Sequence, residues 1–139
     1  MTEFELNEVR ELRLEINELV ERLNRLRAKA VHATQIISDM PRAPNVRSKV
    51  ERTALEAVDV ERELTALHER LTLAAERLTA RILSEVSEPL MQGLLLMRYV
   101  KCLSFKNAAR RLRISLRHAY RLHTRFLRQV LASPPSDVL

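Results

Sequence analysis

Apolar side chains recur along the first part of the chain in alternating steps of three and four residues. The repeat runs over four heptads without a break, through Val9, Leu12, Ile16, Leu19, Leu23, Leu26, Ala30, Ala33 and Ile37. A sustained period of 3.5 residues is typical of a helix that packs along another helix. Glu and Arg fill the positions between, as on a solvated face. The pattern therefore predicts a long amphipathic helix.

The repeat ends in a polar segment that contains Pro41 and Pro44, two residues that end a helix and turn the chain. A second repeat with the same steps follows, through Val50, Thr53, Ala57, Val60, Leu64, Leu67, Leu71, Ala74 and Leu78, and it then drifts to Ile82 and Val86. Two seams of matching length predict an antiparallel helical hairpin over residues 1–86, with its turn near 39–48.

The seams are also candidates for assembly, because two helices alone bury little apolar surface. The further partner is either the C-terminal part of the chain or a second copy, and a homodimer is the favoured oligomer. The residues assigned to this assembly seam are Leu12, Ile16, Leu19, Leu23, Leu26, Leu64, Leu67, Leu71 and Leu78.

A different pattern follows Val86. Ser87 is a candidate helix cap before Pro89, and Gly93 lies inside the next helix, where it would permit close packing. Ser104 and Ser115 each precede an apolar periodic segment and are candidate N-caps. They predict a short helix over 105–112, a three-residue turn, and a longer helix over 116–131. Residues 133–139 are expected to form a flexible tail.

The apolar positions of these two short helices indicate how they pack. Small Ala109 would let the helices cross closely, and the expected core between them consists of Ala108, Leu112, Ile114, Ala119 and Leu122. This layout is that of a helix-turn-helix, in which the second helix enters the major groove of DNA. The fold class expected is therefore all-α, a long antiparallel hairpin followed by a helix-turn-helix domain over residues 87–132.

Composition and charge favour the same interpretation. The 139 residues include one Gly and no Trp, and aromatic residues make up 4%, which favours long helices over a β-rich fold. Residues 1–86 hold 14 Lys/Arg and 16 Asp/Glu, whereas residues 87–139 hold 10 and 2. A net charge of +8 in the last 53 residues predicts a polyanionic partner for that part.

The segment from Leu90 to Leu131 resembles known DNA-binding modules. The residues that carry the resemblance are Leu96-Met97-Arg98-Tyr99, Leu103-Ser104-Phe105, Ala108-Ala109 and Ser115-Leu116-Arg117-His118-Ala119-Tyr120-Arg121-Leu122-His123. The segment is similar to the sigma-factor region-four helix-turn-helix and, more closely, to phage late-gene transcriptional activators of the RinA/ArpU type. The resemblance implies a sequence-specific regulator of phage or prophage late genes that binds double-stranded DNA and contacts RNA polymerase. Many such motifs have glycine where this chain has Arg113, because the turn needs a positive φ.

Polar side chains of this motif fall into two groups. Base-edge contacts carry sequence information and usually come from the N-terminal half of the second helix, whereas phosphate contacts come from the flanks. The base-edge candidates are Arg117, His118, Tyr120, Arg121 and Thr124. The phosphate candidates are Ser104, Lys106, Arg110, Arg113, Ser115, Arg125 and Arg128.

Other chemistry finds little support in the residue pattern. One glycine cannot make a phosphate-binding loop, and no catalytic constellation is present, so no enzyme activity and no cofactor are predicted. His118 and His123 are five residues apart and cannot share a helix face as zinc ligands do, so no metal is expected. His123 is expected to pack or cap, and Cys102 to be a small apolar filler near a helix end.

The expected location is the cytoplasm of a bacterial or phage-infected cell. The chain has no apolar stretch of about 18 residues, an acidic N-terminus unlike a signal peptide, and a single cysteine. The alternative function is a helical assembly or adaptor protein, for example in phage DNA packaging. In that case the hairpin would be the functional surface and DNA binding would be non-specific.

Overall fold

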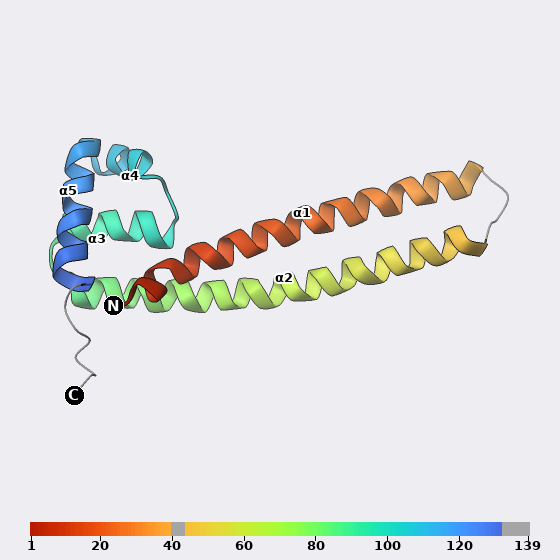
Figure 1. Cartoon of the computed structure of the whole chain (residues 1–139), viewed down its shortest axis with the longest axis horizontal. Coiled ribbons are helices and arrows are strands. Elements are labelled where there is room, and N and C mark those ends of the chain that lie inside the picture. The colour runs from red at the N-terminus through yellow and green to blue at the C-terminus, as the bar shows by residue number, and fades with distance from the viewer. Residues whose placement is uncertain (40–43, 132–139) are drawn as a thin grey trace, which may run out of the picture. The chain divides into compact units, whose positions relative to one another are not determined.

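The chain is helical throughout the part that the structure describes. The computed structural model describes the backbone of residues 1–39 and 44–131 and the side chains of residues 1–32 and 49–129. In chain order, with η for a π-helical segment, the elements are α1 (Glu3–Asp39), α2 (Pro44–Glu85), α3 (Pro89–Leu95), η1 (Leu96–Val100), α4 (Phe105–Leu112), α5 (Leu116–Phe126) and η2 (Leu127–Leu131) (Figure 1). No strand occurs among these residues, so the all-α prediction is confirmed.

Contacts divide the chain into two compact units, each of which contains part of α1 and part of α2. One unit is Arg13–Arg70, and the other joins Met1–Leu12 to the chain from Leu71 onward. The predicted separation of an assembly region, 1–86, from a DNA-binding domain, 87–132, concerns function and stays a prediction. The predicted tail, 133–139, lies outside the described residues.

The unit Arg13–Arg70 is built on the predicted seams of two long helices that pack together (Figure 1). Its buried apolar side chains are Ile16, Leu23, Leu26, Val60, Leu64 and Leu67, whereas Leu19 is half-buried. Burying one such side chain contributes roughly 1.5–3 kcal/mol. On the surface, Arg27 Nη2 lies 2.8 Å from Glu61 Oε1 and joins α1 to α2.

In the other unit the seam of α1 starts one step earlier than predicted, at Leu6, which is buried with Val9 and Leu12. Glu8 and Glu5 pair with Arg77 and Arg81, at 3.7 Å and 3.5 Å, so the numbering falls along α2 as it rises along α1. This order is that of antiparallel helices. The partners of the α1 seam on α2 are Ala74, Leu78, Ile82 and Val86, all buried, whereas Leu71 is half-buried.

A capping box begins α1. The backbone N–H of Glu5 donates to Thr2 Oγ1 at 3.2 Å, and the N–H of Thr2 donates to Glu5 Oε2 at 2.9 Å. Two otherwise unpaired donors at the helix start are satisfied in this way. The Thr-x-x-Glu spacing was a sufficient signal for this cap, and the sequence analysis missed it.

The break between the long helices is narrower than predicted. α1 continues to Asp39, and α2 begins at Pro44, whose fixed φ suits the first turn of a helix. The predicted turn near 39–48 is therefore too long at its C-terminal end, because Pro44 starts a helix there. Residues 40–43, which include Pro41, lie outside the described residues.

Three short helices complete the unit that contains Leu71. α3 contacts α4 and α5, and α4 contacts α5. A Cβ added to Gly93 of α3 would lie 3.0 Å from Cδ2 of Leu112, so the glycine permits close packing, as predicted. Leu112 and Ile114 are only half-buried, which corrects their expected place in the core. The fully enclosed core consists of Met91, Leu94, Leu95, Ala108, Ala109, Ala119, Leu122 and Phe126.

One local prediction before α4 is wrong, and another concerns a residue with an unusual backbone conformation. Glu88, not Ser87, is the N-cap residue of α3, because Pro89 occupies the first turn and sets the boundary one residue later. Cys102 lies near a helix end, as predicted, and is half-buried, with a φ of 57°. It ends the helix that includes η1, and its Sγ lies 3.7 Å from the carbonyl oxygen of Tyr99.

Candidate nucleic-acid interface

The two serine caps lie where the sequence places them. The backbone N–H of Asn107 donates to Ser104 Oγ at 3.2 Å, and that of His118 donates to Ser115 Oγ at 3.1 Å. These bonds begin α4 and α5 at the predicted residues. The predicted 116–131 helix is present as α5 followed directly by η2.

The turn between α4 and α5 is a Schellman motif. Arg113 has φ 59° and ψ 41°, in the left-handed region that usually takes glycine, as the departure noted in the sequence implied. The N–H of Arg113 donates to Arg110 O at 3.2 Å, and the N–H of Ile114 donates to Ala109 O at 3.0 Å. These two bonds satisfy carbonyl groups at the end of α4 and turn the chain toward α5.

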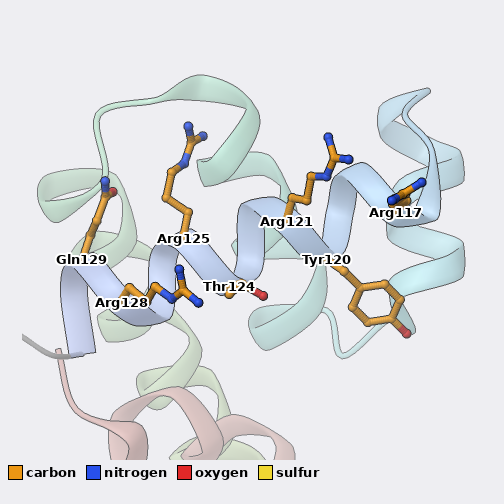
Figure 2. A pocket seen from close by; sticks show the side chains of 7 residues that line it. All are labelled: Arg117, Tyr120, Arg121, Thr124, Arg125, Arg128 and Gln129. Atoms are coloured by element: carbon orange, nitrogen blue, oxygen red, sulfur yellow. The ribbon is translucent and has the colours of Figure 1, made fainter.

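A shallow hollow follows the outer face of α5 and continues onto η2 (Figure 2). Arg117, Arg121, Arg125 and Arg128 are spaced four, four and three residues apart, which places them along one side of the helix. We call these four residues the arginine row. All the lining side chains are exposed, and they are Arg117, Tyr120, Arg121, Thr124, Arg125, Arg128 and Gln129.

Four of the five base-edge candidates line this hollow: Arg117, Tyr120, Arg121 and Thr124. In Figure 2, Arg121 and Arg125 project in the same direction from α5, whereas Tyr120 points away from them. His118 is half-buried and does not line the hollow. The hollow therefore brings together two of the predicted arginines and two side chains that carry a hydroxyl group.

The phosphate candidates are more dispersed. Arg125 and Arg128 line the hollow with the base-edge candidates. Lys106 and Arg110 on α4 and Arg113 in the turn are exposed but lie outside that lining. Ser104 and Ser115 are exposed at the helix starts, where their hydroxyl groups already accept the capping hydrogen bonds.

One member of the arginine row has a carboxylate partner. Arg125 Nη2 lies 2.7 Å from Oε2 of Glu88, and both side chains are about half exposed. Among the described residues, no carboxylate pairs with Arg117, Arg121 or Arg128. Sequence reasoning missed the pair because its members are 37 residues apart.

A cluster of rings supports the hollow from beneath, and sequence reasoning found only part of it. His123 packs as expected: its ring stacks on Tyr99 at 5.8 Å and meets the edge of Phe105 at 4.8 Å. Phe105 in turn contacts Tyr120 at 4.8 Å, and Arg98 lies 4.6 Å above the Phe105 ring. The cluster thus holds Tyr120, a member of the hollow, against the start of α4.

Burial changes the titration of two groups in this cluster. Burial lowers the pKa of His123 from its ordinary 6.5, and the nearby Arg98 lowers that pKa further. Burial also raises the pKa of Tyr99 above 10.0, partly offset by Arg98. The Tyr99 hydroxyl and His123 Nε2 are 2.5 Å apart, at hydrogen-bonding distance. Both groups are therefore neutral near pH 7 and serve the packing of α5.

The described residues form neither a metal-binding cluster nor a membrane-spanning helix. Within residues 1–39 and 44–131, no three His, Cys, Asp or Glu side chains lie close enough together to hold a metal ion. Over the same part of the chain, no helix has the length and the hydropathy needed to cross a bilayer. No protein-family model matches this sequence, and neither a curated protein nor a solved structure matches it.

Proposed function

We propose that this chain is a transcriptional regulator that binds specific sites in double-stranded DNA. α4, the turn at Arg113 and α5 act as a helix-turn-helix, and α5 enters the major groove. Arg117 and Arg121 meet base edges there, while Arg128 reaches a phosphate. The observation that carries this proposal is the hollow that gathers the arginine row with Tyr120 and Thr124 on one exposed helix face.

The arginine row supports a polyanionic partner because, among the described residues, three of its four members have no carboxylate partner in the fold. Arginines four residues apart on a helix repel one another by about 0.2–0.5 kcal/mol per pair. Against DNA the same row neutralises phosphates and releases condensed counterions, which favours binding. A guanidinium group also fits the O6 and N7 edge of guanine, which gives discrimination between base pairs.

The packing behind the row supports the proposal because it fixes α5 closely against α4. Ala108, Ala109 and Ala119 are buried, and small side chains let α4 and α5 cross closely. Lys106 and Arg110 lie on exposed positions of α4, which in this motif crosses the DNA backbone. The apolar seams of the long helices add the proposal that the regulator acts as a homodimer. The resemblance to sigma-factor region four adds the proposal that it contacts RNA polymerase.

Selection of binding sites from a random duplex library by the full-length chain tests the proposal. We expect an enriched sequence, with two half-sites about 10 base pairs apart if the chain binds as a dimer. Fluorescence anisotropy with the selected duplex and a scrambled duplex should give affinities that differ by about a thousandfold or more. A ratio near one would contradict the proposal and favour the non-specific assembly or adaptor protein.

Two matched variants assign the roles of the arginines. Arg121→Ala should weaken binding to the selected duplex by about 1–3 kcal/mol, and it should reduce the discrimination between base pairs at one or two positions of the site. Arg110→Ala should weaken binding to both duplexes equally. It should also reduce by about 1 the slope of the logarithm of the binding constant against the logarithm of the salt concentration. Equal proportional losses on both duplexes for both variants would show that α5 does not read bases.

A further inference from the structure

Glu88 has an unusual place in the basic part of the chain. It and Asp137 are the two acidic residues after Val86, against ten Lys and Arg. As the N-cap residue of α3, Glu88 makes no side-chain capping bond. Its carboxylate instead lies 2.7 Å from the guanidinium of Arg125, a residue that lines the α5 hollow. The one acidic side chain described in this part therefore forms an ion pair with a member of the arginine row.

This contact is made by the fold and not by local helix geometry. The pair joins the start of α3 to α5 across 37 residues, so it depends on the packing of α3 against α5. A carboxylate and a phosphate present similar pairs of oxygen atoms to a guanidinium group. Because Glu88 already binds Nη2 of Arg125, a DNA phosphate would compete with it for that nitrogen.

We infer that Glu88 is an intramolecular competitor of DNA phosphate at Arg125, and this inference rests on the proposed function. A phosphate at Nη2 of Arg125 has to displace Glu88, so one of the four cations in the arginine row is already partly neutralised before a duplex binds. Arg117 and Arg121 stay available for base edges. Glu88 thus sets how tightly, and with what salt dependence, the chain holds DNA of any sequence, while the arginines near the start of α5 set which sequence it prefers.

The variant Glu88→Gln tests this competition in full-length protein, with fluorescence anisotropy on the selected and the scrambled duplex over a range of salt concentrations. We expect several-fold tighter binding to both duplexes and a log-log salt slope steeper by about 1, since one more phosphate is neutralised. Glu76→Gln on α2 is the matched control, because it removes the same charge from an exposed helix position. The control should leave the salt slope unchanged.

The second residue of the pair completes the test. Arg125→Ala alone should change the salt slope of the native chain little. When it is added to Glu88→Gln, it should abolish both the tighter binding and the steeper salt slope of that variant. An unchanged slope in Glu88→Gln, or a gain that survives without Arg125, would overturn the competition while leaving the DNA-binding proposal intact. Failure of the native chain and of Glu88→Gln to bind any duplex would instead reject the proposed function, and the competition with it.

Discussion

The long helices and the short C-terminal helices use arginine in opposite ways. On α1 and α2, Arg27, Arg77 and Arg81 each have a carboxylate partner on the other helix. On α5, by contrast, only Arg125 of the arginine row is paired among the described residues. Charges that are balanced across two helices serve the fold, whereas a row left unbalanced raises the energy of the fold and is suited to a ligand of opposite charge.

The two regions also differ in how they bury apolar surface. The helix pair relies on leucine and isoleucine at heptad spacing, as at Ile16, Leu23 and Leu64. The short helices combine alanines at the crossing with larger side chains, of which Leu94, Leu95 and Phe126 are fully buried. The helix pair gains stability from the length of its seam. In the short helices, the close approach of the backbones places α5 precisely.

The largest effect that we expect comes from removing a side chain of the seam. Leu23→Ala should lower the free energy of unfolding by about 2–5 kcal/mol, because Leu23 is 6% exposed and truncation leaves a cavity. Leu14→Ala is the control on the same helix, since Leu14 is 55% exposed. Urea denaturation followed by circular dichroism measures both, and equal losses would show that the seam is not the core of the helix pair.

A gain of stability should follow from glycine at the strained turns. Arg113 and Cys102 both have positive φ, which costs a non-glycine residue roughly 1–2 kcal/mol, partly offset by the greater freedom of glycine in the unfolded chain. Arg113→Gly and Cys102→Gly should therefore each raise the free energy of unfolding by several tenths to about 1 kcal/mol. A lower melting temperature for either variant would mean that the native side chain stabilises its turn.

Acid should affect the short helices through His123. Because the folded-state pKa of His123 lies below its ordinary 6.5, the folded state favours the neutral ring. Its contribution to stability is present above about pH 6.5 and is lost as the pH falls through the lowered pKa. His123→Gln cannot titrate, so its stability should depend less on pH between 7 and 5 than that of the native chain. Identical pH profiles from urea denaturation would rule out this role.

The smallest expected effect is the change in the free energy of unfolding when one arginine from each region is replaced by glutamine. Arg121→Gln should raise the free energy of unfolding by a few tenths of a kcal/mol, because it removes repulsion from Arg117 and Arg125. Arg81→Gln should lower it by a similar amount, because Arg81 lies 3.5 Å from Glu5 and 3.0 Å from Glu85. Changes of the same sign in the two variants would contradict the contrast between balanced and unbalanced arginines.

Features set by local sequence could be predicted. Ser104 and Ser115 gave the starts of α4 and α5, since a cap acts within three residues of its own position. Heptad spacing gave the seams, because a helix repeats its faces at short intervals. Leu6 was missed at the end of a seam, where few neighbouring repeats remain to mark the pattern.

Features set by tertiary packing could not be predicted. The contact of Glu88 with Arg125 and that of Tyr99 with His123 join residues that are 37 and 24 positions apart. No helix period relates such positions, and only the packing of α3 and η1 against α5 decides which of several basic or aromatic side chains meet. Phe126 is different, because its spacing from Ala119 and Leu122 places it on their buried face and was a sufficient local signal.

The distribution of aromatic residues provides an intrinsic fluorescence probe, so the short helices can be followed without a chemical label. The chain has no Trp, and its two tyrosines are Tyr99 in η1 and Tyr120 in α5. Intrinsic fluorescence excited at the tyrosine band therefore originates from the short helices alone, whereas the far-ultraviolet dichroism is dominated by the 37 residues of α1 and the 42 of α2. Recording both signals during one titration separates melting of the short helices from melting of the helix pair. A ligand that reaches Tyr120 should alter the emission and leave the dichroism of α1 and α2 unchanged.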